Sequence, residues 1–168
     1  MVHELAEFER APEQCRLTAN QLRAALFPAD RPAALFGHVA VDGAGAPLGY
    51  ALWFLNFSTW AGVHGVYLED LYVRPAARGT GAGRRLLAAL AQVCVERGYE
   101  RLEWVMIDWN PAGDFYRAVG AAPTDGWVPY RLTGPALRAL AERSGAVPAP
   151  VEFGPVHQRV ESGPGGTP

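Results

Sequence analysis

The segment most clearly suited to chemistry is Arg78-Gly79-Thr80-Gly81-Ala82-Gly83-Arg84, which lies between an expected strand and an expected helix. Its alternating glycines let successive backbone N–H groups converge on an anion, because no Cβ atoms stand in the way. The first turn of the following helix adds N–H groups without partners and the positive end of its dipole. Arg78 and Arg84 can add charge-assisted hydrogen bonds to phosphate oxygens. This combination predicts a site for a diphosphate.

Four interpretations of this glycine segment are open. A nucleotide P-loop has the pattern GxxxxGKS/T, and no lysine follows the glycines here. The dinucleotide fingerprint is GxGxxG directly after a strand, with an acid about 20 residues later. Here the spacing is GxGxG after a loop that contains Pro75, although Glu100 stands at roughly that separation. The segment can also be a glycine-rich helix start without a ligand. The interpretation we favour is the pyrophosphate of coenzyme A.

Composition narrows the class of protein. The chain has 168 residues, a net charge of -2 and a sequence pI of about 6.1, without a basic stripe, so we expect no nucleic-acid binding. We find no signal peptide and no run of about 18 apolar residues, so no membrane association is expected. Cys15 and Cys94 form no recognisable pair, which favours a reduced, cytoplasmic setting. The histidines lack the spacing of metal ligands, so no metal is expected.

Periodicity and turn residues predict an α/β fold with a mixed sheet, in which an antiparallel meander precedes strand–helix–strand units. The domain is expected to span residues 1–143, and a Pro/Gly-rich tail at 144–168 is expected to be poorly ordered. Thr18 is the expected N-cap of the second helix, and Gly98 the expected C-cap of the central one. The expected helices are 3–10, 18–26, 79–97, 112–119 and 135–143, and the expected strands are 35–41, 48–57, 65–73, 101–107 and 127–132.

The stretch from Val73 to Arg84 resembles the acetyl-CoA motif of the GNAT acetyltransferases, Arg/Gln-x-x-Gly-x-Gly/Ala. The stretches ELAEFE, YLEDLYV and DWN, together with Phe115 and Tyr116, are similar to the diamine (spermidine/spermine) acetyltransferase branch, which includes enzymes that act on thialysine. The resemblance covers roughly residues 2–140. It implies a GNAT-type acyl-CoA N-acyltransferase fold, direct transfer of an acetyl group from acetyl-CoA to a primary amine, and a homodimer.

The resemblance also places the cofactor. The end of the third strand would offer backbone hydrogen bonds to the pantetheine arm, and the glycine segment would hold the pyrophosphate. Asn110 would contact the cofactor near its thioester. The residues assigned to acetyl-CoA are Leu71, Tyr72, Val73, Arg78, Gly79, Thr80, Gly81, Ala82, Gly83, Arg84 and Asn110.

On the acceptor side, Tyr116 matches the tyrosine that protonates the departing thiolate. Glu69 and Glu9 match acids that receive the cationic substrate, and Phe8 matches their aromatic neighbour. A primary ammonium has a pKa of about 10.4, so a site must desolvate it and remove a proton before attack. We assign that step to Glu69, acting through water. Strand alternation predicts that Asp70 points to the opposite face.

Two departures from the family pattern bear on the site. The loop between Asn110 and Tyr116 is one residue shorter than is usual, so the position of Tyr116 depends on how the loop closes. The chain also begins inside the helix that carries ELAEFE, without the strand that normally precedes it. Without that strand, one edge of the sheet would be open to pairing with another chain.

We therefore expect an acetyltransferase for a small cationic amine, either a polyamine or a thialysine-like compound. One alternative is an enzyme of the same fold that acts on a protein N-terminus, a lysine or an antibiotic amine. A second alternative is a CoA-binding regulatory module without catalysis. Such a module would retain Gly79 to Gly83 and lack a working Glu69 or Tyr116.

Overall fold

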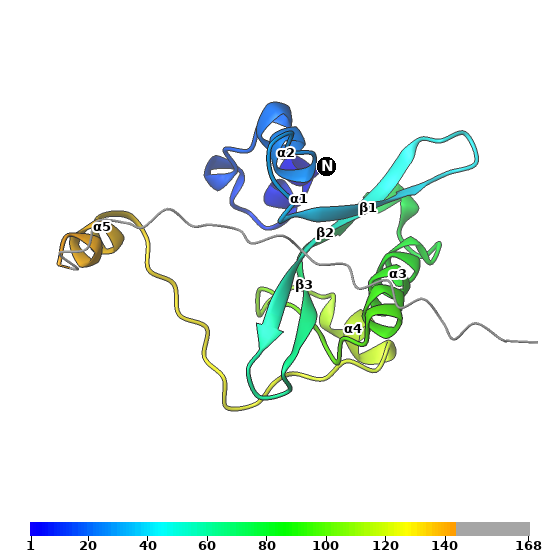
Figure 1. Cartoon of the computed structure of the whole chain (residues 1–168). Coiled ribbons are helices and arrows are strands. Elements are labelled where there is room, and N and C mark those ends of the chain that lie inside the picture. Colours follow the sequence, from blue (N-terminus) through cyan, green and yellow to red (C-terminus); the bar gives the residue numbers. More distant parts are fainter. Residues whose placement is uncertain (144–168) are drawn as a thin grey trace, which may run out of the picture. The chain divides into compact units, whose positions relative to one another are not determined.

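The computed structural model describes residues 1–143 (Figure 1). The chain forms two compact units, and the boundary between them in the sequence falls between Ala122 and Pro123. The expected tail at 144–168 lies outside the described residues, and the expected domain of residues 1–143 remains a prediction. None of the helices in the described part of the chain has the length and apolar character that crossing a bilayer requires.

The first unit is built on a four-stranded mixed sheet with the order β1-β2-β3-β4, of which Figure 1 labels the first three strands. Strands β1 (Phe36–Val41), β2 (Pro47–Ser58) and β3 (Val63–Val73) form an antiparallel meander, and β4 (Leu102–Glu103) runs parallel to β3. Asp42 shapes the first hairpin, because its Oδ1 accepts hydrogen bonds from the N–H groups of two later turn residues at 2.9 and 2.8 Å. The predicted mixed α/β fold is confirmed.

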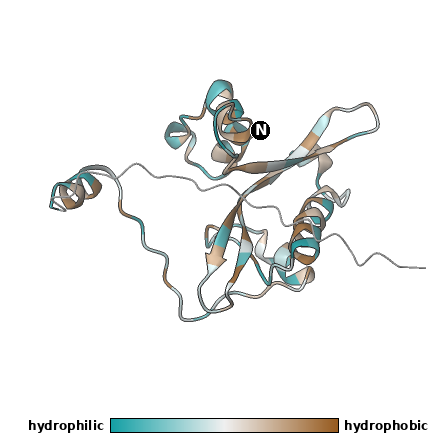
Figure 2. Cartoon of the chain, viewed as in Figure 1, coloured by the Kyte–Doolittle hydropathy of each residue, from teal (hydrophilic) through white to brown (hydrophobic). Residues whose placement is uncertain are grey.

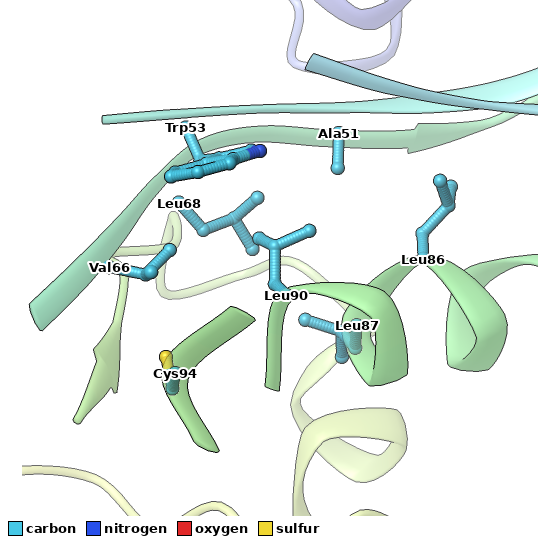
Figure 3. Packing of buried hydrophobic residues seen from close by; sticks show 8 residues of the cluster. All are labelled: Ala51, Trp53, Val66, Leu68, Leu86, Leu87, Leu90 and Cys94. Carbon is cyan, nitrogen blue, oxygen red and sulfur yellow. The ribbon is translucent and has the colours of Figure 1, made fainter. Parts of the chain in front are cut away.

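Helices cover both faces of this sheet. The central helix α3 (Ala82–Arg97) packs its apolar face on one side, and Figure 3 shows Leu86 and Leu90 directed toward residues of the strands. Helices α1 (Val2–Phe8) and α2 (Ala19–Leu26) lie on the other side, around a second apolar cluster. In Figure 2 the ribbon of α3 alternates between apolar and polar colours, as expected for a helix with one buried side. The core against α3 consists of Ala51, Trp53, Val66, Leu68, Leu86, Leu87, Leu90 and Cys94.

Local capping signals place two helix ends correctly, the start of α2 and the end of α3. Thr18 caps α2 in a reciprocal capping box with Gln21, as predicted. Gly98 ends α3 with a φ of 67°, which is the left-handed conformation expected at this position. The start of α3 was placed too early, because Gly79 and Gly81 have φ values of 78° and 82°. Both lie outside the α-helical range, so the helix begins at Ala82.

Two expected strands are corrected by the structure. The strand expected at 101–107 is reduced to Leu102–Glu103, because only these residues pair with β3. The segment 127–132 in the second unit forms no strand, and Tyr130 is 95% exposed. Its apolar and aromatic residues have strand propensity, but propensity alone does not make a strand, and Pro129 lacks an N–H donor. The remaining helices are α4 (Gly113–Ala118), α5 (Gly134–Glu142) and the 3-10 turns η1 (Pro12–Gln14) and η2 (Pro75–Ala77).

Candidate active site

A β-bulge in β3 brings two consecutive acids to the same cleft. Leu52 of β2 pairs with Asp70 and Trp53 pairs with Leu68, so Glu69 is an extra residue without a partner in β2. An extra residue shifts the alternation of the side chains by one. Leu68 packs in the core under α3, whereas Asp70 lies on the opposite side, the side of α1. The expectation that Asp70 points away from Glu69 is therefore wrong, and both residues line one cleft.

The cleft has a volume of about 520 Å³ and opens where β3 and β4 separate. Strand β4 pairs with β3 only at Val66 and Tyr67. Beyond that point, residues 68–73 line the cleft on one side and residues 104–106 line it on the other. Within the described residues, no strand pairs with the β4-facing edge of β3 beyond Tyr67. This edge can offer backbone hydrogen bonds to an extended ligand.

The glycine segment presents backbone N–H groups at one end of the cleft. The first hydrogen bond of α3 runs from the N–H of Arg85 to the carbonyl of Gly81 at 3.0 Å. The N–H groups of residues 82–84 therefore have no partner within the helix. Gly79, Gly81 and residues 82–84 all line the cleft. The left-handed turns at the two glycines and the helix dipole together favour an anion at this point.

Side-chain hydrogen bonds to backbone carbonyls stabilise the glycine segment. The hydroxyl of Thr80 donates to the carbonyl of Ala77 at 2.8 Å, and Nη1 of Arg85 donates to the carbonyl of Thr80 at 3.2 Å. The Thr80 side chain is thus engaged within the loop, and Thr80 does not line the cleft. Nη2 of Arg84 reaches the carbonyl of Ala118 at 3.5 Å, which links the start of α3 to the end of α4.

Arg78 lines the cleft beside two aromatic rings. Its Nε donates to the carbonyl of Val73 at 3.1 Å. The guanidinium carbon lies 4.9 Å from the ring centroid of Phe8 and 6.0 Å from that of Tyr72. These contacts fix the side chain while its terminal nitrogens make no hydrogen bond to the described residues. The terminal N–H groups are therefore available to an anionic ligand.

Tyr116 enters the cleft from α4. The shortened loop after Asn110 closes without moving it out of the site, because Tyr116 lines the cleft together with Phe115. Its ring centroid lies 4.7 Å from that of Trp104 and 5.2 Å from that of Phe115. Burial, and secondarily the negative charge of Glu9, raises the pKa of the Tyr116 phenol. The phenol therefore stays protonated at neutral pH and can act as a proton donor.

Three carboxyl groups converge at the other side of the cleft. Glu9, Glu69 and Asp70 all line it, and the hydroxyl of Tyr50 donates to Oδ2 of Asp70 at 3.3 Å. Burial, followed by the charge of Glu69, raises the pKa of Asp70 from 3.8 to about 6, although the bond from Tyr50 opposes this shift. Burial also raises the pKa of Glu9. Acids that repel one another in a partly dehydrated pocket favour a cation between them.

The structure brings all but one of the predicted site residues to this cleft. Asn110 lies in a loop, and its Oδ1 accepts a hydrogen bond from the N–H of Ala112 at 3.0 Å. The one predicted site residue that does not line the cleft is Thr80, whose hydroxyl is bonded within the loop. The predicted residues that line the cleft are Phe8, Glu9, Glu69, Leu71, Tyr72, Val73, Arg78, Gly79, Gly81, Ala82, Gly83, Arg84, Asn110 and Tyr116.

Sequence reasoning missed Asp70 as a cleft residue. A signal for the bulge does exist, since the residues of β3 that pack against α3 are Val66, Leu68, Leu71 and Val73. The step from 68 to 71 is three residues instead of two, which marks the extra residue. The aromatic side chains of Tyr67 and Tyr72 obscure this step, because they make the strand look apolar on both faces.

The separated strands, the glycine turn at a helix start and the buried phenol define the class of acyl-CoA-dependent acyltransferases. The acetyltransferase (GNAT) family model matches residues 2–121. The thialysine N-epsilon-acetyltransferase of Bos taurus is 36% identical over 154 residues, which cover 84% of this chain and 88% of that protein. The L-ornithine N5-acetyltransferase of Arabidopsis thaliana is 41% identical over 93 residues, or 55% of this chain and 41% of that protein.

Solved structures agree with this match. An integron cassette protein from the mobile metagenome of V. cholerae has a TM-score of 0.68 at 27% identity, covering 83% of this chain and 86% of that one. The chain belongs to the acetyltransferase (GNAT) family. It is thus an acyltransferase, and this family uses acetyl-CoA as co-substrate. Among the described residues, no group of three or more His, Cys, Asp or Glu side chains is arranged to hold a metal ion.

Proposed function

We propose that this protein transfers the acetyl group of acetyl-CoA directly to a primary amine of a small cationic acceptor, a polyamine or a thialysine-like compound. The observation that carries the proposal is the convergence of Glu9, Glu69 and Asp70 in one cleft with Tyr116. Three carboxyl groups in one pocket suit a cation, and a protonated phenol in the same pocket suits a leaving thiolate. The names of the relatives above, which act on thialysine and ornithine, support the same class of acceptor.

The chain offers matching contacts for each part of acetyl-CoA. The β4-facing edge of residues 71–73 would hydrogen-bond to the pantetheine arm, since no described strand occupies it. The glycine segment with Arg78 and Arg84 would hold the pyrophosphate. The positive φ of Gly79 and Gly81 is the local feature that fits a diphosphate, because it turns backbone N–H groups toward the cleft.

In the proposed reaction the amine nitrogen bonds to the acetyl carbon, and the carbon–sulfur bond breaks. Glu69 and Asp70 hold the ammonium, and Glu69 takes its proton through water. Tyr116 gives its phenolic proton to the departing thiolate, and the second proton, released by the acylated nitrogen, returns through water to the Tyr116 phenolate. Neither cysteine lines the cleft, and Cys94 is buried in the core, where burial raises the pKa of its thiol. No acyl-enzyme is formed on this route.

A panel of amines tests the function. We expect release of free thiol when the protein is mixed with acetyl-CoA and spermidine, ornithine, lysine or thialysine, detected with a thiol reagent. A peptide N-terminus and an aminoglycoside serve as competing acceptor classes. Thermal stabilisation by CoA without thiol release from any amine would contradict the proposal and favour a binding module. Release with the peptide or aminoglycoside alone would favour the alternative enzyme.

The Asp70→Asn variant is expected to be more stable than the natural protein at a pH of about 8 and to have a lower kcat/KM for the amine. The folded state holds the proton of Asp70 more tightly than the unfolded chain, because the pKa rises from 3.8 to about 6. The folded protein therefore has its full stability below a pH of about 4, where Asp70 is protonated in both states. It loses stability as the pH rises through about 6, because Asp70 must then ionise in a partly buried position. Thermal melts across this range should show a gain for the variant that is largest above pH 6 and vanishes near pH 4.

The exposed Asp30→Asn variant is the matched control for Asp70→Asn and should show no such pH-dependent gain. An equal gain in both variants would assign the effect to net charge. A gain in stability together with an unchanged kcat/KM for the amine would remove Asp70 from the acceptor site.

We further propose a homodimer and a cytoplasmic setting. The outer edge of β1 pairs with no described strand, and Val39 and Val41 on it are 58% and 53% exposed. An open edge with apolar side chains supports association with a second copy. Cys15 and Cys94 are both free, which supports a reducing compartment. Light scattering coupled to gel filtration tests the dimer, and fractionation of producing cells tests the compartment.

A further inference from the structure

Arg10 occupies an unusual position at the end of α1. The N–H of Ala11 donates to the carbonyl of Ala6 at 2.9 Å, and the N–H of Arg10 donates to that of Glu7 at 3.1 Å. This is a Schellman-type ending, in which glycine is preferred because the residue is left-handed. Arg10 has a φ of 61° and is the only residue other than glycine with a positive φ in the described part of the chain. The chain thus carries a long cation where local structure favours no side chain.

The Arg10 side chain lies next to an aromatic residue that is in turn adjacent to residues lining the cleft. Its guanidinium carbon is 4.5 Å from the ring centroid of Trp109, which in turn is 6.1 Å from that of Phe8. Phe8 and Asn110, the neighbour of Trp109, both line the cleft. Stacking over an aromatic face orients a guanidinium and leaves its N–H edges free. Among the described residues, no carboxylate forms a salt bridge with Arg10.

Glu9 stands beside Arg10 and faces the reacting groups. It lines the cleft, and its negative charge is one of the causes that raise the pKa values of Asp70 and Tyr116. Glu9 is therefore close enough to the proposed reaction centre to interact electrostatically with Asp70 and Tyr116. Consecutive residues thus present a carboxylate and a guanidinium at the same end of the cleft.

We propose that Glu9 and Arg10 together bind the zwitterionic head group of an α-amino acid, whose side-chain amine is the acetyl acceptor. This inference rests on the proposed function and narrows its substrate class. The α-carboxylate would receive charge-assisted hydrogen bonds from the Arg10 guanidinium, and the α-ammonium would lie against Glu9. The terminal amine would then extend to Glu69 and Asp70.

The same pair disfavours a polyamine. A diamine has a second ammonium in place of the zwitterion, so the charge of Arg10 would repel it. Glu9 alone would attract either acceptor, because both carry an ammonium at this end. Arg10 is therefore the residue that distinguishes the two classes, and it acts on substrate binding without joining the chemical step.

Acceptors that differ only in the α-carboxyl group test this proposal. The pairs are L-ornithine with 1,4-diaminobutane and L-lysine with 1,5-diaminopentane. We expect the Arg10→Gly variant to lose about 10- to 100-fold in kcat/KM for each amino acid through KM, as expected for a lost hydrogen bond between charged groups. Its kcat/KM for each diamine should be unchanged or higher. Glycine suits the left-handed backbone, so the variant should fold at least as well as the natural chain.

Two controls sharpen the result. Arg10→Lys keeps the charge without the planar guanidinium and should retain part of the preference for amino acids. Arg31→Ala removes an exposed cation that does not line the cleft and should change neither acceptor class. Equal losses for amino acids and diamines, or no loss for either, would overturn the role of Arg10 while leaving the acetyltransferase function intact.

Binding measured without turnover separates the two proposals. Calorimetric titration of L-lysine and 1,5-diaminopentane into the complex with CoA should show about a 10-fold or greater loss of affinity in Arg10→Gly for lysine alone. If the natural protein acetylates no amine, the proposed function fails, and this titration still decides the head-group site. If it binds lysine no better than the diamine, the head-group site is overturned.

Discussion

Replacing Tyr116 by phenylalanine is expected to lower kcat by about 10²- to 10⁴-fold, the usual contribution of a positioned general acid. The ring lies between Trp104 and Phe115 and fills the same space without its hydroxyl, so the fold and the KM for acetyl-CoA should change little. What is lost is the proton for the departing thiolate. Burial keeps that proton on the phenol by raising its pKa, so the natural enzyme should not lose activity through this group as the pH rises through 9. Steady-state thiol release measures kcat and both KM values.

The control for Tyr116→Phe is Tyr99→Phe. Tyr99 is also half-buried but does not line the cleft, so its variant should keep full activity. Comparison of thermal melts for the two variants separates catalysis from stability. A kcat for Tyr116→Phe within about threefold of the natural value would assign proton donation to another group, since it would correspond to well under 1 kcal/mol.

The Gly81→Val variant is expected to weaken the binding of CoA by about 10- to 100-fold. Gly81 caps α3 with a φ of 82°, and a β-branched residue in that region costs on the order of 1–3 kcal/mol. In the free protein the loop can relax into another conformation. Binding then requires the strained conformation to be restored, so the cost appears in the affinity. Calorimetric titration with CoA measures the change directly.

Gly98 offers a matched control at the opposite end of the same helix. It caps the C-terminus of α3 with a φ of 67°, so Gly98→Val introduces comparable strain without touching the glycine segment. Gly98→Val should lower the melting temperature and leave the Kd for CoA unchanged. Equal Kd values for Gly81→Val and the natural protein would show that the turn at the start of α3 does not hold the diphosphate.

These predictions place the two halves of the reaction on different parts of the fold. The cofactor side rests on the start of α3 and the exposed edge of β3, both of which depend on backbone groups. The acceptor side rests on side chains from α1 and from the bulge of β3. Substitutions at Arg10 should therefore change acceptor choice, and substitutions at Glu9 should weaken both acceptor classes, while neither alters the affinity for CoA.

Features that depend on neighbours in the chain were predictable from the residues alone. The capping box of Thr18 and Gln21, the C-cap at Gly98 and the left-handed turns at Gly79 and Gly81 each involve groups a few residues apart. Their energetics are local, because glycine conformation and helix-end hydrogen bonds depend little on the rest of the fold. The prediction of a diphosphate site in the glycine segment therefore depends on local residues alone.

Features that depend on distant pairing could not be obtained in that way. The bulge at Glu69 is defined by the register of β3 against β2, and it moved Asp70 into the cleft. Strand β4 is short because it pairs with β3 only at Val66 and Tyr67. The segment 127–132 pairs with no described strand. Strand pairing and the stacking of Arg10 on Trp109 join residues far apart in the chain. Their free energy is gained only after the chain has folded, so local patterns such as the three-residue step in β3 encode them only weakly.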